Sequence, residues 1–357
     1  MLPMPNRSRL LRFPEGTVIN HRYLLVSPND HSSGGSGVRA AATAKGADVD
    51  LDSAEEPPST CYRSSYPSAS YVSPLGEGGS SVVFLARQVV CDPHRGPQTI
   101  ARAVKFYLLS PTLARHCDPR QQQAANIQNL RNEIENLISI RHANILKGID
   151  TGVCVRSGIP VDYLVTEYVP GPTLAEVIAC GAACSGTQRQ TTAGALAYRQ
   201  VRRNPPVTVR ILDQLCGAIE HLHDQGIYHC DIAPKNVFIH PEGYRPILGD
   251  FALGWQPGRE GYAERLPLGG AMRYAPPSYQ QLPPSLHGAQ GRREFAAYAA
   301  HWDIYGFAKS ALELVNLVPA GSSLPWKNAL VRYLHEALVV ENGVTAAALH
   351  RRISRLL

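Results

Sequence analysis

The chain has 357 residues, of which 44% are hydrophobic and 18% are charged, a composition that is typical of a globular protein and excludes a largely disordered chain. It contains no run of about 18 apolar residues, so we expect no membrane-spanning helix. The formal net charge of +6 comes mostly from scattered arginines rather than from a basic stripe with aromatic residues, which argues against nucleic-acid binding.

The cysteines and the first residues indicate a cytoplasmic protein. The eight cysteines are dispersed, and no histidine completes a metal-binding spacing around Cys180 and Cys184, which lie close together. We therefore expect free thiols in a reducing cytosol. Residues 1–16 contain arginines but no long apolar core, so we expect no secretory signal. The sequence does not indicate an oligomeric state.

The chain begins with one expected strand and a linker. Residues 16–26 alternate apolar and polar side chains, which predicts a strand within an N-terminal segment, 1–26. Residues 27–70 are rich in Ser, Gly, Pro and Ala with a small acidic cluster, which predicts a flexible linker or insertion. A β-rich half at 71–169 and a helical half at 170–357 are expected to follow.

A glycine-rich segment and a strand lysine follow the linker. Gly76 and Gly78 stand between two strand-like runs, so their backbone could approach a phosphate closely, although for this segment alone an ordinary hairpin turn is the better interpretation. Lys105 lies in the next strand pair among Ala, Val and Phe, where an ammonium group is costly to bury without an anionic partner. The alternative is an edge lysine whose ammonium group reaches solvent.

A helix, two strands and an insertion are expected next. Residues 120–141 show a helical spacing of Ile and Leu and carry Glu133. Two strands are expected near 146–155 and 161–168, and a Pro-Gly-Pro sequence then marks a hinge. Residues 181–206 contain four arginines and end in two prolines. We interpret them as a solvated loop, with a basic docking loop as the alternative.

The most informative segment lies between a helix and a short strand. The helix expected at 207–223 carries Ile and Leu on one face and leads into the turn His229–Asn236. Asp231 and Asn236 stand five residues apart on this turn, which suits a base aimed at a hydroxyl and an amide aimed at a metal ion. A second aspartate, Asp250, follows in the sequence Gly-Asp-Phe.

The order of these motifs resembles that of the protein kinase family. A glycine loop, a strand lysine, a helix glutamate, a hinge, Asp-x4-Asn and Asp-Phe follow one another within 71–317, and 16–26 and the C-terminus fit more loosely. The resemblance implies an α+β fold with two lobes, a small β-rich N-lobe at 71–169 and a larger α-helical C-lobe at 170–357. It also implies ATP and Mg²⁺ as cofactors and a protein as the substrate.

The resemblance assigns a role to each matching residue. Asp231 would accept the proton of the substrate hydroxyl or orient that hydroxyl, and Asn236 and Asp250 would hold Mg²⁺. Lys105 would contact the α- and β-phosphates, and Glu133 would form an ion pair with it. The nucleotide would be bound by Leu75, Gly76, Gly78, Val83, Ala103, Lys105, Thr166, Glu167 and Val169.

Some departures from the family pattern concern regulation. Cys230 replaces the arginine that receives a phosphate on the activation loop in the family, and residues 250–277 contain no serine or threonine. The arginine that binds the phosphate and the Ser/Thr residues that would carry it are both absent, so we expect activity without Ser/Thr phosphorylation of this loop. Ala252 replaces the glycine of Asp-Phe-Gly, which should make flipping of this segment harder. Asp303 matches the buried helix aspartate that braces the catalytic loop.

Other departures concern the acceptor hydroxyl. Ala233 and Ala271 replace a lysine and a threonine that contact one another in Ser/Thr-specific kinases. Lys235, four residues after Asp231, could reach the γ-phosphate instead, and the alternative is a solvated loop lysine. The sequence therefore indicates an ATP-dependent protein kinase that acts on a protein hydroxyl, with serine or threonine favoured. A nucleotide-binding pseudokinase or scaffold and a kinase of small molecules stay open as alternatives.

Overall fold

The computed structural model describes residues 11–28, 71–77, 81–107, 130–131, 133–156, 159–182, 192–257, 271–277, 288–319, 325–339 and 343–357. The chain divides into two compact units, which we call the β unit and the helical unit. The β unit comprises Met1–Leu113 and Ile149–Tyr168, and the helical unit comprises Ala114–Gly148 and Val169–Leu357. Residues 114–148 thus fall in the helical unit, whereas the sequence-based boundaries counted them with the β-rich half.

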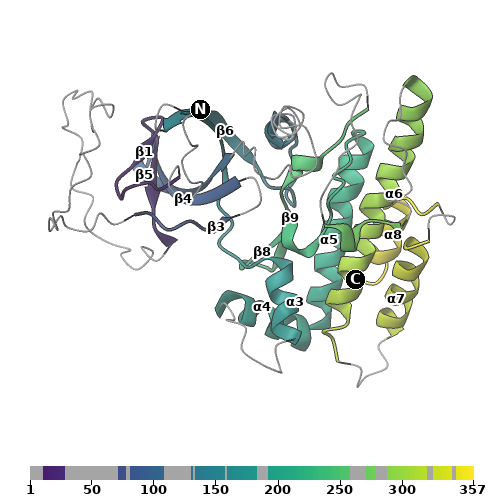
Figure 1. Ribbon diagram of the computed structural model, residues 1–357. Helices are drawn as coiled ribbons and strands as arrows, with labels where there is room; N and C mark the ends of the chain where they lie inside the picture. The colour runs from purple at the N-terminus through teal and green to yellow at the C-terminus, as the bar shows by residue number, and fades with distance from the viewer. Residues whose placement is uncertain are drawn as a thin grey trace, which may run out of the picture. The chain divides into compact units, whose positions relative to one another are not determined.

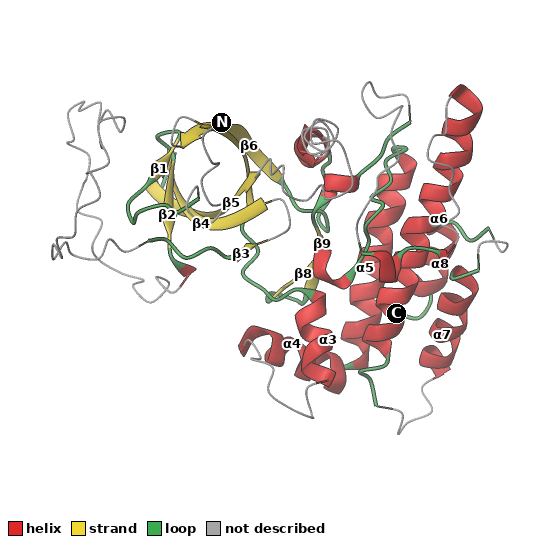
Figure 2. Ribbon diagram, in the orientation of Figure 1, coloured by secondary structure: helices red, strands yellow, loops and turns green. Residues whose placement is uncertain are grey.

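The β unit contains a seven-stranded sheet that curls on itself (Figure 2). Its strands are β1 (Val18–Ile19), β2 (Tyr23–Val26), β3 (Gly76–Glu77), β4 (Ser81–Asp92), β5 (Gly96–Tyr107), β6 (Gly148–Arg156) and β7 (Ile159–Glu167). The order across the sheet is β1-β2-β4-β5-β7-β6, with β3 paired to β4. At the end of the long β4–β5 hairpin, the Asp92 carboxylate accepts hydrogen bonds from the His94 and Arg95 N–H groups at 2.7 and 2.9 Å.

Alternation along the strands collects apolar side chains into an enclosed core. The core cluster takes every second residue of the central strands, namely Val82, Phe84 and Ala86 of β4, Val104 and Phe106 of β5, and Val161, Tyr163 and Val165 of β7. Phe13 completes this cluster from outside the sheet. Its ring centroid lies 5.1 Å from that of Phe84 and 4.8 Å from that of Phe106. The segment before β1 is therefore part of the folded unit.

The strand expected at 16–26 forms two short strands instead of one. β1 and β2 pair antiparallel, with Ile19 opposite Tyr23, around a turn at Asn20 and His21. Both turn residues have positive φ, 49° and 53°, a conformation in which Asn and His are enriched among non-glycine residues. The alternating pattern did not reveal the turn because neither glycine nor proline marks it.

The helical unit is built around α5 (Pro205–Asp224), whose apolar face is buried. α5 contacts α4 (Thr192–Arg203), α6 (Gly288–Val315) and α8 (Ala346–Ser354), as Figure 1 shows. Further helices are α3 (Leu174–Ala182) and α7 (Pro325–Ala337), and helical turns also cover 130–131 and 133–139. α5 begins with two prolines, which suit a first helical turn because an N–H group there would have no partner within the helix.

The interpretation of 181–206 as a solvated loop is wrong for the part that forms α4. Ala197 and Val201, one helical turn apart, are buried, whereas the arginines at the C-terminal end of α4 are exposed. α4 is amphipathic, with Ala197 and Val201 on its buried side, but the segment as a whole is polar. The arginines and the two prolines dominate the composition and favoured a loop.

A two-stranded hairpin in the helical unit positions the candidate site. β8 (Val237–His240) pairs antiparallel with β9 (Arg245–Leu248), and α5 contacts β9. Thr173 makes a further bridge to Phe238, so the start of α3 is tied to the same hairpin. The hairpin is short, but it is anchored on both sides by the helices of its unit.

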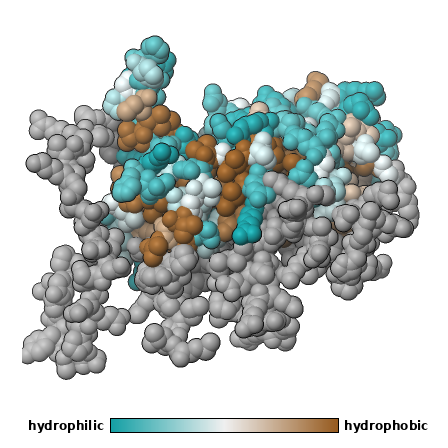
Figure 3. All heavy atoms as spheres, turned by 90° about the horizontal axis from the view of Figure 1, so that it is seen from above, coloured by the Kyte–Doolittle hydropathy of each residue, from teal (hydrophilic) through white to brown (hydrophobic). Residues whose placement is uncertain are grey.

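The described surface mixes polar and apolar side chains. On the face in Figure 3, apolar residues lie in small groups between hydrophilic ones. Exposed large hydrophobic residues include Val89, Val153 and Val155 of the β unit, and single exposed apolar residues are normal for a folded protein. None of the described helices combines the length and the apolar content that a membrane crossing requires.

Replacing Phe13 by alanine should destabilise the β unit although Phe13 lies outside the strands. Phe13 is fully buried, and a buried Phe→Ala substitution typically lowers the free energy of unfolding by about 3–5 kcal/mol. We expect a loss of this size in chemical denaturation. Leu24→Ala, which truncates an exposed side chain of β2, is the control and should cost less than about 1 kcal/mol. Equal losses in the two variants would contradict a core role of Phe13.

Candidate active site

The turn predicted at His229–Asn236 follows the end of α5. α5 ends at Asp224, and Gly226, with φ of 67°, provides the left-handed residue that redirects the chain. Tyr228 then exchanges two backbone hydrogen bonds with Trp255, at 2.8 and 2.7 Å. The start of the turn is thereby tied to a later segment of the chain by main-chain contacts.

Asp231 and Asn236 meet across the turn. Pro234–Asn236 form a single 3-10 turn that brings the Asn236 side chain back to Asp231. Asn236 Nδ2 donates hydrogen bonds to the backbone oxygen of Asp231 at 2.8 Å and to its carboxylate Oδ2 at 2.9 Å. Both residues are buried. Because these two acceptors require a donor, the amide nitrogen faces Asp231 and the amide oxygen Oδ1 is available to a different partner.

Two further groups orient the Asp231 carboxylate. The backbone N–H of Ala271 donates to Oδ1 at 2.7 Å, and the exposed Lys235 ammonium lies 3.2 Å from Oδ2. The carboxylate is therefore held at both of its oxygens, with a positive charge beside it. A group that takes a proton from a bound hydroxyl has to be fixed within hydrogen-bond reach of that hydroxyl, and this arrangement fixes Asp231.

The β8–β9 hairpin brings Asp250 to the same end as Asn236. Val237 lies opposite Leu248 in the ladder, so the residues just before β8 and just after β9 leave the hairpin together. The N–H of Gly249 donates to the backbone oxygen of Asn236 at 2.8 Å. Asp250 has a left-handed backbone, with φ of 62° and ψ of 68°, a strained conformation that clusters at functional sites.

An amide oxygen and a carboxylate at one end of a hairpin fit a magnesium site. Mg²⁺ prefers oxygen ligands and is usually held by one or two carboxylates together with water and substrate phosphates. Oδ1 of Asn236 and the carboxylate of Asp250 are ligands of this kind. No three His, Cys, Asp or Glu side chains gather into a metal cluster within the described ranges, and a site completed by phosphates needs none.

Asp303 braces the turn from α6. Its buried carboxylate accepts hydrogen bonds from the backbone N–H groups of His229, at 2.8 Å, and Cys230, at 2.7 Å. His223 Nε2 lies 3.0 Å from the same carboxylate. Cys230 has φ of 58°, so the brace holds a non-glycine residue in a left-handed conformation. The contact that the resemblance implies for Asp303 is present.

The ring of His229 links the turn to the segment that carries Asp250. Its Nδ1 accepts a hydrogen bond from the Asp231 N–H at 3.2 Å, so a neutral ring carries its proton on Nε2, which donates to the Gly249 carbonyl at 3.0 Å. The ring also packs edge-on against Phe251, with centroids 4.6 Å apart. One buried side chain therefore couples the predicted base to the predicted metal ligand.

In the β unit, residues expected to bind the nucleotide share one face of the sheet. Val83 lies opposite Lys105, and Ala103 lies opposite Thr166, in the antiparallel ladders. Directly paired residues point to the same side, and these four alternate with the residues of the enclosed core. Gly76 pairs with Val83 from β3. The sheet thus gathers these residues on the face opposite its core.

The other residues expected to bind the nucleotide come from different parts of the chain. The N–H of Leu75 donates to a carbonyl of β4 at 2.8 Å, and the Thr166 hydroxyl donates to the Glu167 carbonyl at 3.0 Å. Val169 is half-buried just after β7. Gly78 lies outside the described residues. The binding roles of all these residues stay predictions.

Lys105 and Glu133 belong to different units. Lys105 is half-buried on β5, with its ammonium 5.2 Å from the centroid of the Tyr107 ring. Glu133 is buried in the helical unit, on the helical turns at 133–139. The ion pair that the resemblance implies between these side chains stays a prediction.

Sequence reasoning missed the residues that anchor the end of the activation loop. Arg273 Nη2 donates to Glu313 Oε1 at 2.7 Å, and the Tyr274 hydroxyl donates to Oε2 at 2.9 Å. Glu313 lies on α6, far along the chain, and no spacing rule connects it with the loop. Ala271 contributes through its backbone N–H, which a side-chain pattern cannot reveal.

Comparison with known proteins agrees with this geometry. Residues 70–279, more than half of the chain, match the protein kinase domain. The chain belongs to the protein kinase family. The α+β fold expected for this kinase is confirmed, with a curled β-sheet in one unit and helices predominating in the other.

The kinase is similar to several bacterial proteins over part of its length. It is 30% identical over 165 residues to the serine/threonine-protein kinase PknB of Mycobacterium leprae, covering 46% of this chain and 21% of that protein. It is also 30% identical to the probable serine/threonine-protein kinase PknB of Corynebacterium glutamicum, covering 50% and 22%. For PknB of Mycolicibacterium smegmatis the identity is 30%, and the coverage is 50% and 23%. The alignments thus span less than a quarter of these relatives.

Replacing Asp303 by alanine should release the turn. Two buried N–H groups would lose their acceptor, and each unsatisfied group costs about 1–3 kcal/mol, so we expect the free energy of unfolding to fall by about 2–6 kcal/mol. Hydrogen exchange at the His229 and Cys230 N–H groups should accelerate. Asp303→Asn keeps one carbonyl acceptor and should lose less. Unchanged exchange at both amides in the alanine variant would refute the brace.

The raised pKa of the Tyr274 hydroxyl predicts that the protein loses stability at alkaline pH. Burial, and then the hydrogen bond and charge of Glu313, raise the pKa of Tyr274 from 10.0 to about 12. The unfolded chain releases this proton near pH 10, whereas the folded protein keeps it. The contribution of Tyr274 to the free energy of unfolding is therefore complete below pH 10 and is lost between about pH 10 and 12. Denaturation across this window should show the loss, and Tyr274→Phe should reduce it, whereas the exposed control Tyr71→Phe should not. Identical profiles for the wild type and Tyr274→Phe would contradict this assignment.

Proposed function

We propose that this protein is an ATP- and Mg²⁺-dependent protein kinase that transfers the γ-phosphoryl group to a serine or threonine hydroxyl of a protein. The observation that carries the proposal is the grouping of Asp231, Asn236 and Asp250 at one turn and one hairpin end, with Asp303 bracing the turn. The relatives in Mycobacterium leprae and Corynebacterium glutamicum are named as serine/threonine-protein kinases, which supports the acceptor class.

Asp231 is the residue that we expect to receive the substrate hydroxyl. Its carboxylate is oriented by Asn236 and by the Ala271 N–H, so a hydroxyl that donates a hydrogen bond to it is held in one direction. Lys235, beside the same carboxylate, would stabilise negative charge on the transferred group. Mg²⁺ bound at Asn236 and Asp250 would supply charge neutralisation for the phosphates.

The β unit would hold the nucleotide on the face opposite its core. Val83 and Ala103 offer apolar contacts for the adenine ring, and the backbone of Glu167 and Val169 offers hydrogen bonds to its edge. Lys105 would contact the α- and β-phosphates with Glu133 as its partner. The residues of this face form a contiguous set in the ladders, which supports a common ligand.

An apolar cluster takes the place of the phosphate-binding arginine of the family. The cluster joins Cys230 to Leu253, Trp255 and Ala275 from the two ends of the activation loop and to Phe295, Ala299 and Trp302 of α6. Burial raises the pKa of the Cys230 thiol well above its usual range, so the side chain packs as a neutral group. We therefore propose that apolar packing holds the loop ends and that activity needs no phosphate on this loop.

Phosphotransfer by the purified, phosphatase-treated protein tests the proposal. With γ-labelled ATP and Mg²⁺, we expect label on the protein itself or on a generic substrate, and acid hydrolysis should yield phosphoserine or phosphothreonine. Asp231→Asn should lower the rate by about 10²–10⁴-fold, and Lys105→Met should also lower it. Asp92→Asn and Lys309→Met make the same charge changes elsewhere and should leave the rate unchanged.

Other outcomes separate the alternatives. Stabilisation by nucleotide without any transfer would support a nucleotide-binding scaffold and contradict the kinase proposal. Phosphotyrosine in the hydrolysate would contradict the proposed acceptor class. Transfer that disappears on phosphatase treatment would contradict activity without loop phosphorylation.

The thiols support a proposal about the compartment. The described cysteines, Cys91, Cys154, Cys180, Cys216 and Cys230, are unbridged, as is usual for proteins of a reducing compartment. We propose the cytoplasm. Recovery of the protein from a secreted fraction of its own cells would contradict this location.

A further inference from the structure

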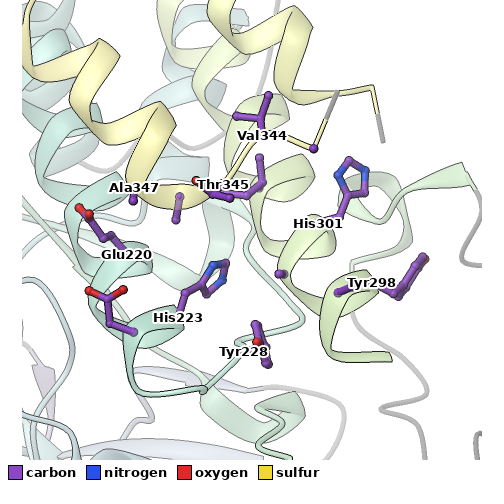
Figure 4. A pocket seen from close by; sticks show the side chains of 14 residues that line it. Glu220, His223, Tyr228, Tyr298, His301, Val344, Thr345 and Ala347 are labelled. Carbon is purple, nitrogen blue, oxygen red and sulfur yellow. The ribbon is translucent and has the colours of Figure 1, made fainter. Parts of the chain in front are cut away.

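The helical unit contains a cavity that is separate from the predicted catalytic residues. Its volume is about 620 Å³, within the range of about 300–1,000 Å³ that small-molecule sites occupy. The end of α5, the middle of α6 and the start of α8 form its walls (Figure 4). None of Asp231, Lys235, Asn236 or Asp250 lines it. Phosphotransfer as proposed above therefore does not use this cavity.

Four aromatic rings dominate the lining. His223 and Tyr228 come from the end of α5 and the chain after it, with ring centroids 5.1 Å apart, and Tyr298 and His301 come from α6. In Figure 4, His223 and Tyr228 lie on one side and Tyr298 and His301 on the other, and Val344 comes from the segment just before α8. Such rings accept a flat apolar molecule between them, and the faces of the two tyrosines attract a cation.

The charged residues of the lining are acidic. Glu220 and Asp224 border the cavity from α5, and no lysine or arginine lines it within the described chain. Burial lowers the pKa of His301 below its usual value, so this ring is neutral at physiological pH. Its buried Nε2 has no hydrogen-bond partner among the described residues. A cationic ligand with N–H groups would match the carboxylates and could satisfy this nitrogen.

Two features reduce the negative charge without reversing it. His350 Nδ1 hydrogen-bonds Glu220 Oε2, and the N-terminus of α8 carries about half an elementary positive charge. Thr345 caps that N-terminus by accepting a hydrogen bond from the Ala348 N–H at 3.2 Å. Even if His350 is protonated, the two carboxylates carry more negative charge than His350 and the helix N-terminus carry positive charge. The lining therefore favours a cation over an anion.

We propose that this cavity binds a small aromatic molecule that carries a cationic amine, and that binding there stabilises the catalytic turn. The rings enclose the aromatic part, and the carboxylates of Glu220 and Asp224 hold the amine. No residue of the proposed nucleotide or metal site takes part.

His223 connects the cavity to the turn. Its ring lines the cavity, and its Nε2 lies 3.0 Å from the carboxylate of Asp303, which accepts the N–H groups of His229 and Cys230 at 2.8 and 2.7 Å. A ligand that packs against His223 limits its motion and so strengthens its contact with Asp303. Any effect of the ligand on phosphotransfer rests on the proposed kinase function. Binding of the ligand and its effect on the turn do not.

A fluorescent amine tests the binding. Dansylcadaverine joins a naphthalene ring to a primary amine and becomes brighter in apolar surroundings, and its N-acetyl derivative has the same ring without the charge. We expect saturable binding of dansylcadaverine to the full chain and binding about tenfold weaker for the acetylated probe. Equal affinity for the two probes, or no saturable binding, would overturn the proposed ligand class.

Variants locate the site. Ala300→Phe on α6 and Ala347→Phe on α8 fill the cavity from two walls, and each should abolish binding, whereas Ala193→Phe on the exposed side of α4 should not. The double substitution Glu220→Gln and Asp224→Asn should reduce binding of the amine to that of the acetylated probe. Glu242→Gln, on an exposed turn, is the charge control. Unchanged binding in a cavity-filling variant that melts like the wild type would refute this location.

Hydrogen exchange tests the coupling without relying on phosphotransfer. Saturating dansylcadaverine should slow exchange of the His229 and Cys230 N–H groups. His223→Phe keeps an aromatic wall but removes the contact with Asp303, so it should retain binding and lose the slowing. Bound probe with unchanged exchange at both amides would overturn the link to the turn, and this result is independent of whether the protein transfers phosphate.

Discussion

Two consecutive backbone N–H groups, those of His229 and Cys230, converge on the buried carboxylate of Asp303, and the rest of the candidate site depends on this contact. A positive φ at a non-glycine residue costs about 1–3 kcal/mol. Hydrogen bonds to a charged group contribute about 1.5–3 kcal/mol each, so two of them outweigh the strain at Cys230. Because Asp231 is the next residue, the position of its carboxylate follows from the same brace.

Strand register places the other predicted site residues in each unit. The β8–β9 ladder sets Asn236 beside Gly249 and so brings Asp250 to the same end of the hairpin. In the β unit, the ladders put Lys105 and its neighbours on one face and the core around Phe13 on the other. A shift by one residue would exchange these faces, so the packing of the core also maintains the proposed nucleotide face. In the β unit, stability and the proposed function are therefore linked because core residues and nucleotide-face residues alternate along the same strands.

Local spacing determined how much could be predicted from the sequence. Asp231 and Asn236 were predictable because a short interval on a turn brings them together, and long periodic segments such as α5 were predictable for a similar reason. The contact of Tyr274 with Glu313 joins two distant segments and leaves no periodic signal. The cavity is lined by three segments that lie far apart in the sequence, so it too leaves no periodic signal. α4 escaped prediction because its arginines and the two prolines that follow it gave the segment a polar, loop-like composition.

The departures from the family pattern are consistent with a loop held by packing rather than by phosphate. An arginine at position 230 would be surrounded by the apolar cluster, in which the rings of Trp255 and Phe295 lie 4.7 Å apart, and a buried charge without a partner is strongly destabilising. A loop without serine or threonine offers no phosphoserine or phosphothreonine as that partner. Cysteine at this position needs no charged partner, but it also cannot bind a phosphate as the arginine of the family pattern would. Control of the turn can then act through another contact of Asp303, and His223 makes such a contact from the wall of a cavity that is large enough for a ligand.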